Sequence, residues 1–486
     1  MRKTATRPAL LLRRPAVLDG SSVLPSKLRW SLDTILNYLI IASLMIVPWS
    51  VFVAYQISPF PTLFFQRICF FALPALLLAA KVATCPRMQQ ARFRPLSKYF
   101  AYVAYGLLAS QLFGSRAAWV NIEHYFQLLY WMALGAVYIS VTDRPASYHL
   151  NLIRILFTHV PYFALIFATV YLFTPYRPAL LTIVNSQYSA TLGNIDYSYN
   201  LLFNGALPRF CFFYVEPRVA GTMMTLGVFL QLGWMMARRR SHLRIRRSVV
   251  ELAMMGGTLL LIFSHLAFLG LVVAILCGLV IWVVRSESGG WSSLLLGGAV
   301  IVVVAALYVN MTTSMLADLY LRTESAHASE QIGEMLEAHA GKIGAESTIR
   351  TYFDTWLDGM PTLTSNPLGR GVRYYRAGTK DPAEFTASNN SLGNVYLHAG
   401  ILGLFCSVWL ARHLLTTLRI AARRSNLMVL WACRFAIFMM VFGLAIDSIS
   451  LATWYYFLLF LIERGRWDSI RREHFAIWHA TGCWSP

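Results

Sequence analysis

The chain reads VAGTMMTLGVFLQLGWMMA (219–237), then RRRSHLRIRR (238–247), then SVVELAMMGGTLLLIFS (248–264). Each apolar stretch has close to the roughly 20 residues with which a helix crosses the hydrocarbon core of a bilayer. The arginines between them belong in water or among lipid head groups, because burial in hydrocarbon is costly for a charge. The pattern therefore predicts two membrane helices joined by a basic turn.

The composition of the whole chain agrees with this pattern. Of its 486 residues, 57% are hydrophobic and 13% are charged, whereas soluble domains carry about 25% charged residues. The mean hydropathy is +0.53. These values exclude a soluble globular protein and predict an all-α polytopic membrane protein. Apolar windows place about 12 transmembrane helices at 33–55, 62–83, 98–115, 120–141, 152–173, 219–237, 248–264, 265–285, 293–311, 392–415, 427–446 and 448–463.

Basic residues are distributed unevenly about these windows. With the N-terminus inside, and with charges at the inner ends of windows counted as inner, 29 of the 42 Lys and Arg residues fall on the inner side and 11 on the outer side, while Arg67 and Arg434 lie deeper within windows. Membrane proteins carry such an excess on the cytoplasmic side. The asymmetry predicts that both termini are cytoplasmic. It also accounts for the net charge of +20 without a nucleic-acid partner.

The windows divide the chain into five parts. Residues 1–32 form a basic tail, predicted to be cytoplasmic, although a transit peptide has a similar composition. Residues 33–311 hold helices 1–9, residues 392–463 hold helices 10–12, and residues 464–486 form a second cytoplasmic tail. Residues 312–391 are hydrophilic and are predicted to be an outer loop subdomain. Part of it is predicted to be helical, because apolar residues recur there at helical spacing, namely Ile349, Tyr352, Phe353, Trp356 and Leu357.

Arginines on the outer side are unexpected in a membrane protein of this topology. A guanidinium presents a planar fork of donors that matches phosphate oxygens. The outer arginines therefore indicate an anionic ligand on that face. They are Arg209, Arg218, Arg322, Arg350, Arg370, Arg373 and Arg376.

Four segments between residues 209 and 404 resemble one family, the bacterial O-antigen polymerases and O-antigen ligases. Arg209 followed by FCFFYVEPRVAG is similar to the family's arginine, aromatic run and Glu-Pro before a membrane helix. FSHLAFLG (263–270) is similar to a Ser-Arg-Gly helix junction, with His265 in the place of the arginine. NPLGRG (366–371) resembles a Pro-x-Gly-x-Gly turn. NNSLGNVYLHAGILGL (389–404) resembles a pattern that runs from His-Asn-Ser to Gly-Ile-Leu-Gly-Leu.

The resemblance implies a glycosyltransferase-C-like fold in the bacterial inner membrane, with a large periplasmic loop and an active site that faces the periplasm. It implies a polysaccharide polymerase, for O-antigen or exopolysaccharide, that moves a glycan from undecaprenyl diphosphate to a sugar hydroxyl of a lipid-linked repeat unit. No metal and no cofactor are expected. The implied partners are the undecaprenyl-diphosphate-linked oligosaccharide, membrane lipid and a chain-length regulator protein.

One residue departs from the family pattern. Asn389 stands where the family has a histidine, which is associated most strongly with activation of the acceptor hydroxyl in ligases. Its absence favours a polymerase over a ligase and leaves the general base unidentified.

The predicted catalytic residues are Glu216 and Arg218, which flank Pro217 at the start of a predicted helix. Arg218 is predicted to bind the diphosphate and to stabilise the negative charge that develops as it departs. Glu216 is either a general base or the residue that orients Arg218. The alternative is that both charges anchor the helix at the membrane interface.

Further residues are predicted to bind the substrate, and each also has a structural interpretation. Arg350 has Asp354 one helical turn later as a partner, and Arg370 lies between two glycines that also form an ordinary turn. The asparagines are suited to cap a helix, and a histidine inside a membrane helix is often a buried hydrogen-bonded group. The predicted set is Arg209, Arg322, Arg350, Arg370, Asn389, Asn390 and His398.

Two other functions stay open. One is a ligase that transfers the finished glycan to lipid A core or to protein. The other is a flippase or transporter of lipid-linked oligosaccharides, for which matching repeats, broken helices and charges at the membrane midplane are typical. The two halves of this chain do not match, and polar residues concentrate in 312–391, so the enzyme is favoured.

Overall fold

The computed structural model describes residues 31–57, 63–84, 118–142, 144–175, 201–202, 207–208, 217–262, 264–285, 298–299, 302, 367–368, 391–442 and 453–481. Within these ranges the chain is almost entirely helical. The exception is a short antiparallel pair of two-residue strands, β1 (Leu201–Leu202) and β2 (Leu207–Pro208). The all-α prediction therefore holds for the described part of the chain.

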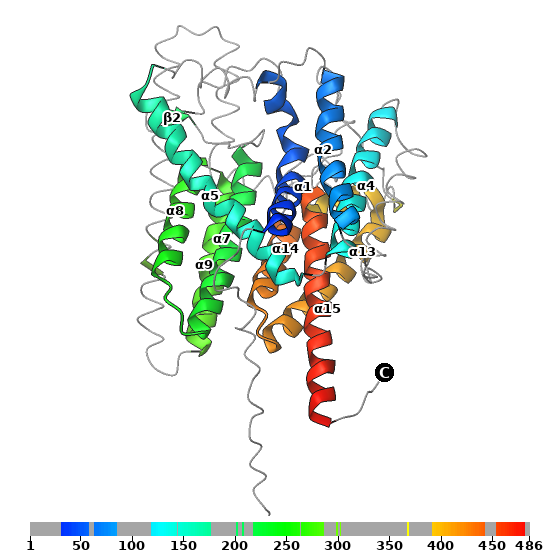
Figure 1. The fold of residues 1–486 in the computed structure, drawn as a ribbon, viewed down its shortest axis with the longest axis vertical. Helices are drawn as coiled ribbons and strands as arrows, with labels where there is room; N and C mark the ends of the chain where they lie inside the picture. The colour runs from blue at the N-terminus through cyan, green and yellow to red at the C-terminus, as the bar shows by residue number, and fades with distance from the viewer. Residues whose placement is uncertain are drawn as a thin grey trace, which may run out of the picture.

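Ten helices lie in the described ranges (Figure 1), and each overlaps one of the predicted apolar windows. The windows 98–115 and 293–311 fall almost wholly outside the described residues. The helices are α1 (Leu32–Ile57), α2 (Leu63–Thr84), α4 (Ala118–Val141), α5 (Ala146–Phe173), α7 (Pro217–Arg240), α8 (Arg246–Ile262), α9 (His265–Arg285), α13 (Ser391–Arg423), α14 (Leu427–Phe442) and α15 (Thr453–Thr481).

Three segments of the described helices are long and apolar enough to cross a membrane. They are Ala146–Val170 in α5, Val219–Arg240 in α7 and Gly400–Arg423 in α13. Shorter apolar segments occur in α1, α2, α4, α9 and α14. These helices indicate a membrane protein.

Helix α7 forms the centre of one half of the bundle. It packs against α5, α8, α9 and α14, and its residues from Val219 to Leu230 are all buried. Glycines let the backbones approach closely, as is common between membrane helices. A Cβ atom on Gly227 would lie 2.6 Å from Phe157 of α5, and one on Gly270 of α9 would lie 2.4 Å from Thr225. Larger residues at these two glycines would force the helices apart.

Helix α15 forms the centre of the other half. It packs against α1, α4, α5, α13 and α14, and its C-terminal part extends beyond the other helices (Figure 1). The residues predicted as a tail, 464–486, are thus helical as far as Thr481. The helix continues because its polar part is packed against protein: Gly465 lies against Val429 of α14 and Ala146 of α5.

Helix α13 is broken at Gly400. This residue has φ 55° and ψ −137°, a backbone conformation that is essentially restricted to glycine. The Ile401 amide donates a hydrogen bond to the Pro367 carbonyl at 2.9 Å instead of to the preceding helical turn. The sequence predicted one uninterrupted helix here, and the structure shows two segments, 391–399 and 401–423.

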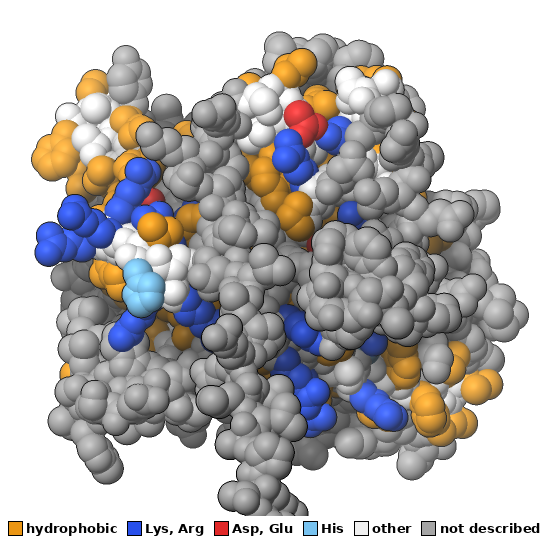
Figure 2. Space-filling model, turned by 60° about the horizontal axis from the view of Figure 1, so that its bottom comes forward, with side chains coloured by type: hydrophobic (Ala, Val, Ile, Leu, Met, Phe, Trp, Pro, Cys, Tyr) orange, Lys and Arg blue, Asp and Glu red, His pale blue; other side chains and the backbone are white. Residues whose placement is uncertain are grey.

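The turns α4–α5, α7–α8 and α13–α14 gather at one end of the bundle, which we name the basic end. Asp468 of α15 accepts a hydrogen bond from the Ala146 amide, and Asn426 donates one to Ser469. A Cβ atom on Gly233 of α7 would lie 3.1 Å from the Leu427 carbonyl oxygen. Lys and Arg side chains outnumber acidic ones on this face (Figure 2). The turn predicted from RRRSHLRIRR therefore belongs to a basic surface shared by several helices.

Candidate functional site

The structure places two of the predicted site residues, both through the backbone of a helix. Arg218 is the second residue of α7, and His398 lies two residues before the break in α13. The other predicted residues lie outside the described ranges: Glu216, Arg209, Arg322, Arg350, Arg370, Asn389 and Asn390.

Helix α7 begins at Pro217 because proline suits a first helical position, where its fixed φ is favourable and its missing N–H is not needed. Arg218 follows in the first turn, where the backbone amides have no partner within the helix. Such amides carry partial positive charge and favour an anion. Arg218 also lies at the opposite end of α7 from Arg238, Arg239 and Arg240, and so away from the basic end.

The break in α13 brings two of the quoted motifs into contact. Pro367 belongs to NPLGRG, and Ile401 belongs to NNSLGNVYLHAGILGL, which is 34 residues further along the chain. Their backbone hydrogen bond fixes the loop motif beside the helix break. Non-helical backbone at membrane depth is tolerated only where it is buried in protein or lines a water-filled cavity. Gly400 is buried, whereas Pro367 and Ile401 are exposed, so the contact lies at the surface of the described part of the bundle.

Helix α14 lies between α7 and α13 and packs against both of them. Arg218 and the break in α13 thus come from two helices that both pack against α14. The FSHLAFLG motif forms the junction between α8 and α9, where Ser264 is buried.

Gly400→Ala tests the role of this break. A side chain at φ 55°, ψ −137° costs about 1–3 kcal/mol, so we expect the variant to have a lower melting temperature in detergent. The matched control is Gly257→Ala in α8, where a Cβ meets nothing within 4 Å and alanine favours the helix. Equal melting temperatures for Gly400→Ala and the wild type would show that the break is not required for the fold.

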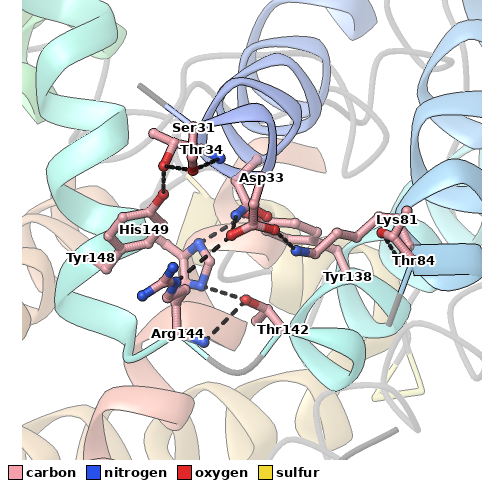
Figure 3. Close-up of polar contacts among 11 residues, drawn as sticks. Ser31, Asp33, Thr34, Lys81, Thr84, Tyr138, Thr142, Arg144, Tyr148 and His149 are labelled. Carbon is pink, nitrogen blue, oxygen red and sulfur yellow. Dashed lines mark hydrogen bonds and ion pairs between the residues drawn. The ribbon is translucent and has the colours of Figure 1, made fainter. Parts of the chain in front are cut away.

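Polar networks that the sequence did not predict lie at the basic end. In the first of them, the Lys81 ammonium of α2 pairs with the Asp33 carboxylate of α1, and Arg144 lies 3.7 Å from the same carboxylate (Figure 3). Lys81 is buried, whereas Asp33 and Arg144 are partly exposed. This network joins the first turn of α1 to the last turn of α2 and to the α4–α5 turn.

His149 lies beside these charges and is fully hydrogen-bonded (Figure 3). Tyr138 donates to the Asn37 side chain at 3.2 Å, and its oxygen lies 3.0 Å from His149 Nδ1. Thr142 Oγ1 lies 3.1 Å from His149 Nε2. The Tyr138 oxygen therefore accepts from Nδ1–H, and Nε2 accepts from Thr142, which describes a neutral imidazole. With every bond satisfied, His149 holds α4 and α5 together and offers no free nitrogen to a substrate.

The second network surrounds Arg154 of α5. Its guanidinium donates to Asn151 at 2.8 Å and to Gln231 of α7 at 2.7 Å, and it lies 3.5 Å from Glu251 of α8. The guanidinium also lies 4.6 Å from the ring centroid of Trp234, a cation–π distance. Gln231 completes the network by donating to Glu251 at 3.0 Å. One buried arginine thus links three helices.

The third network joins α13 to α15. His413 Nε2 lies 2.5 Å from the Glu463 carboxylate, and Arg466 donates to His413 Nδ1 at 3.0 Å. The imidazole is stacked on Trp409 with an interplanar angle of 9°. The Glu463 side chain is 1% exposed, and its Oε1 atom has no hydrogen-bond partner. The network brings a buried acid, a histidine and an arginine together.

One signal in the sequence pointed to these networks. Lys81, Arg154 and His413 lie near the inner ends of apolar windows, and polar groups inside membrane helices are paired as a rule. Their partners are distant along the chain, so the pairs themselves were not predictable. Among the described residues, no group of three His, Cys, Asp or Glu residues is placed to hold a metal ion.

A comparison with protein-family models finds no family that matches the chain, and a comparison with curated proteins finds no similar sequence.

Proposed function

We propose that the chain is a polysaccharide polymerase of the bacterial inner membrane, for O-antigen or exopolysaccharide. In this proposal the chain has twelve membrane helices, a glycosyltransferase-C-like architecture and two cytoplasmic termini. Residues 312–391 form a periplasmic helical loop over an outward-facing active site. The observation that carries the proposal is the hydrogen bond between the Ile401 amide and the Pro367 carbonyl. It joins the motif of the loop to the motif of α13, which the resemblance assigns to one site.

The proposed reaction needs charge stabilisation more than it needs a cofactor. The hydroxyl oxygen of the acceptor sugar attacks the anomeric carbon of the donor glycan, and the bond from that carbon to the diphosphate oxygen breaks. Undecaprenyl diphosphate departs with the electron pair, and the hydroxyl proton goes to a base. Arg218 and the first amides of α7 stabilise the departing diphosphate. Glu216 accepts the proton or orients Arg218.

Substrate binding in this proposal is shared between the loop and the last helices. Arg370 is three residues beyond Pro367, so the chain keeps their Cα atoms within about 11 Å of each other. His398 is on the helical segment that ends at the break. Arg209, Arg322, Arg350, Asn389 and Asn390 complete the proposed substrate-binding set.

The test uses the purified chain and one lipid-linked repeat unit. A ladder of glycans that grows from this substrate alone supports a polymerase. Product that forms only after addition of lipid A core or an acceptor protein identifies a ligase instead. A chain that makes no covalent product under either condition contradicts the proposed reaction.

The break in α13 also fits a second candidate function, a flippase for lipid-linked oligosaccharides. Transporters bind substrates at discontinuous membrane helices, where half-helix ends present polar backbone groups. Proteoliposomes that move the lipid-linked oligosaccharide between leaflets without lengthening it would favour this function.

The proposed topology predicts that a cysteine introduced at position 345 is labelled by a membrane-impermeant maleimide from the periplasm. Residue 345 lies in the predicted outer loop, while 242, in the α7–α8 turn, lies on the predicted inner side. A cysteine at 242 is the matched control and should react only after the inner membrane is opened. Labelling of 345 from the cytoplasmic side only would contradict both the topology and the proposed enzyme.

A further inference from the structure

Helix α13 carries one continuous exposed stripe that changes from apolar to basic. Ile401, Phe405 and Val408 are 58%, 76% and 68% exposed. Arg412, Arg419 and Arg423 continue the same stripe at spacings of four and seven residues, and all three are exposed. Residues at these spacings share one face of a helix. The opposite face is buried, at Leu410, Leu414, Thr417 and Ala421.

The apolar part of the stripe has the length of one lipid leaflet. The eleven steps from Ile401 to Arg412 give a rise of about 16 Å at 1.5 Å per residue, and half of a hydrocarbon core is about 15 Å. An acyl chain lying along this stripe extends from the break in α13 to Arg412. The first arginine therefore stands where the head group of the same lipid lies.

The arginines of the stripe have no acidic partner among the described residues. Three other basic groups at the basic end are paired: Lys81 with Asp33, Arg247 with Glu251 and Arg464 with Asp468. The exposed guanidinium groups of Arg412, Arg419 and Arg423 make no ion pair in the described part of the chain. Their charge is available to a ligand that approaches along the lipid-facing side of α13.

We propose that this stripe, Ile401 to Arg423, binds anionic phospholipid. The acyl chains lie on Ile401, Phe405 and Val408, and the phosphate contacts Arg412 and Arg419. Guanidinium groups form charge-assisted hydrogen bonds with phosphate oxygens, and each basic residue near an anionic membrane surface contributes about 1 kcal/mol. A lipid is favoured over a soluble anion because the apolar and basic parts are continuous. This binding surface is independent of the proposed polymerase activity.

The experiment measures lipid preference in the full chain. Purified protein is titrated with phosphatidylglycerol and with phosphatidylcholine, and bound lipid is counted by native mass spectrometry. We expect the wild type to prefer phosphatidylglycerol. Replacing Arg412, Arg419 and Arg423 together with glutamine should lower this preference about 10²-fold, since each charge contributes about fivefold. The triple lysine variant should retain most of it.

The matched control places three glutamines at Arg239, Arg244 and Arg246, which are exposed at the same end of the bundle. This variant should keep the preference of the wild type. An equal loss in both triple variants would assign the effect to the whole basic end and overturn the α13 site. If free glycerol phosphate binds to the protein as tightly as phosphatidylglycerol does, the site is one for a soluble anion instead. If the triple glutamine variant does not accumulate in the membrane, the single variant Arg412→Gln is measured in its place. An unchanged preference of that variant for phosphatidylglycerol also overturns the proposal.

Discussion

We expect Arg218→Lys to lower the rate of the proposed glycan transfer by about 10²–10³-fold, which is the cost of losing one preorganised contact to a developing charge. The substitution keeps the positive charge and removes the planar fork that binds two phosphate oxygens at once. Arg218 occupies the first turn of α7, where the helix amides already favour an anion. The measurement is the initial rate of ladder formation from a lipid-linked repeat unit.

The control for this prediction is Arg246→Lys, an exposed arginine in the first turn of α8 at the basic end. It should transfer glycan at the rate of the wild type. Arg218→Ala should accumulate in the membrane normally and be at least as slow as Arg218→Lys. If Arg218→Ala still forms full-length polymer, Glu216 and Arg218 only anchor the helix at the membrane interface and the predicted catalytic role is wrong.

Glu463→Ala will destabilise the folded protein by about 3–5 kcal/mol, the usual cost of removing one partner of a buried ion pair. Glu463 is almost fully buried and lies 2.5 Å from His413 and 3.9 Å from Arg466. The substitution leaves the Arg466 charge without its carboxylate and His413 Nε2 without its acceptor. Glu463→Gln keeps a hydrogen-bond acceptor and should be less destabilised. Thermal unfolding in detergent measures the difference.

Arg247→Ala is the matched control for Glu463→Ala. It removes an i,i+4 ion pair with Glu251, but the Arg247 side chain is 90% exposed. Exposed pairs of this kind contribute about 0.3–0.5 kcal/mol. A shift in melting temperature for Glu463→Ala no larger than that for Arg247→Ala would mean that the contact between α13 and α15 is not important for stability.

The sequence predicted the helices well because the signal is local. An apolar run of membrane length, such as 219–237, forms a helix wherever it lies in the bundle, and α7 covers that window with two residues to spare at its start. The position of Arg218 in the first turn of α7 followed from Pro217 in the same way. The number of membrane spans and the outer loop stay predictions, since these depend on residues outside the described ranges.

The polar networks and the break were not predictable, because their causes are not local. His413 and Glu463 are 50 residues apart, and Arg154 and Gln231 are 77 apart. Nothing in the sequence around His413 identifies its partner. Gly400 reads as one of many small residues in a membrane helix, and only the hydrogen bond from Ile401 to Pro367 shows that the helix is interrupted there.

The charged middle of α15 has a consequence for how the chain is made. Its apolar part, residues 453–462, rises only about 15 Å, and Glu463 and Arg464 follow at once. Each charge raises the cost of insertion by about 2.5–3.5 kcal/mol at the centre of a helix, so α15 is poorly suited to enter the bilayer alone. It depends on α13 and α14, which are synthesised earlier and present His413 as a partner. We therefore expect α15 to insert into the membrane only after α13 and α14 have inserted, as the last step in the assembly of the helix bundle.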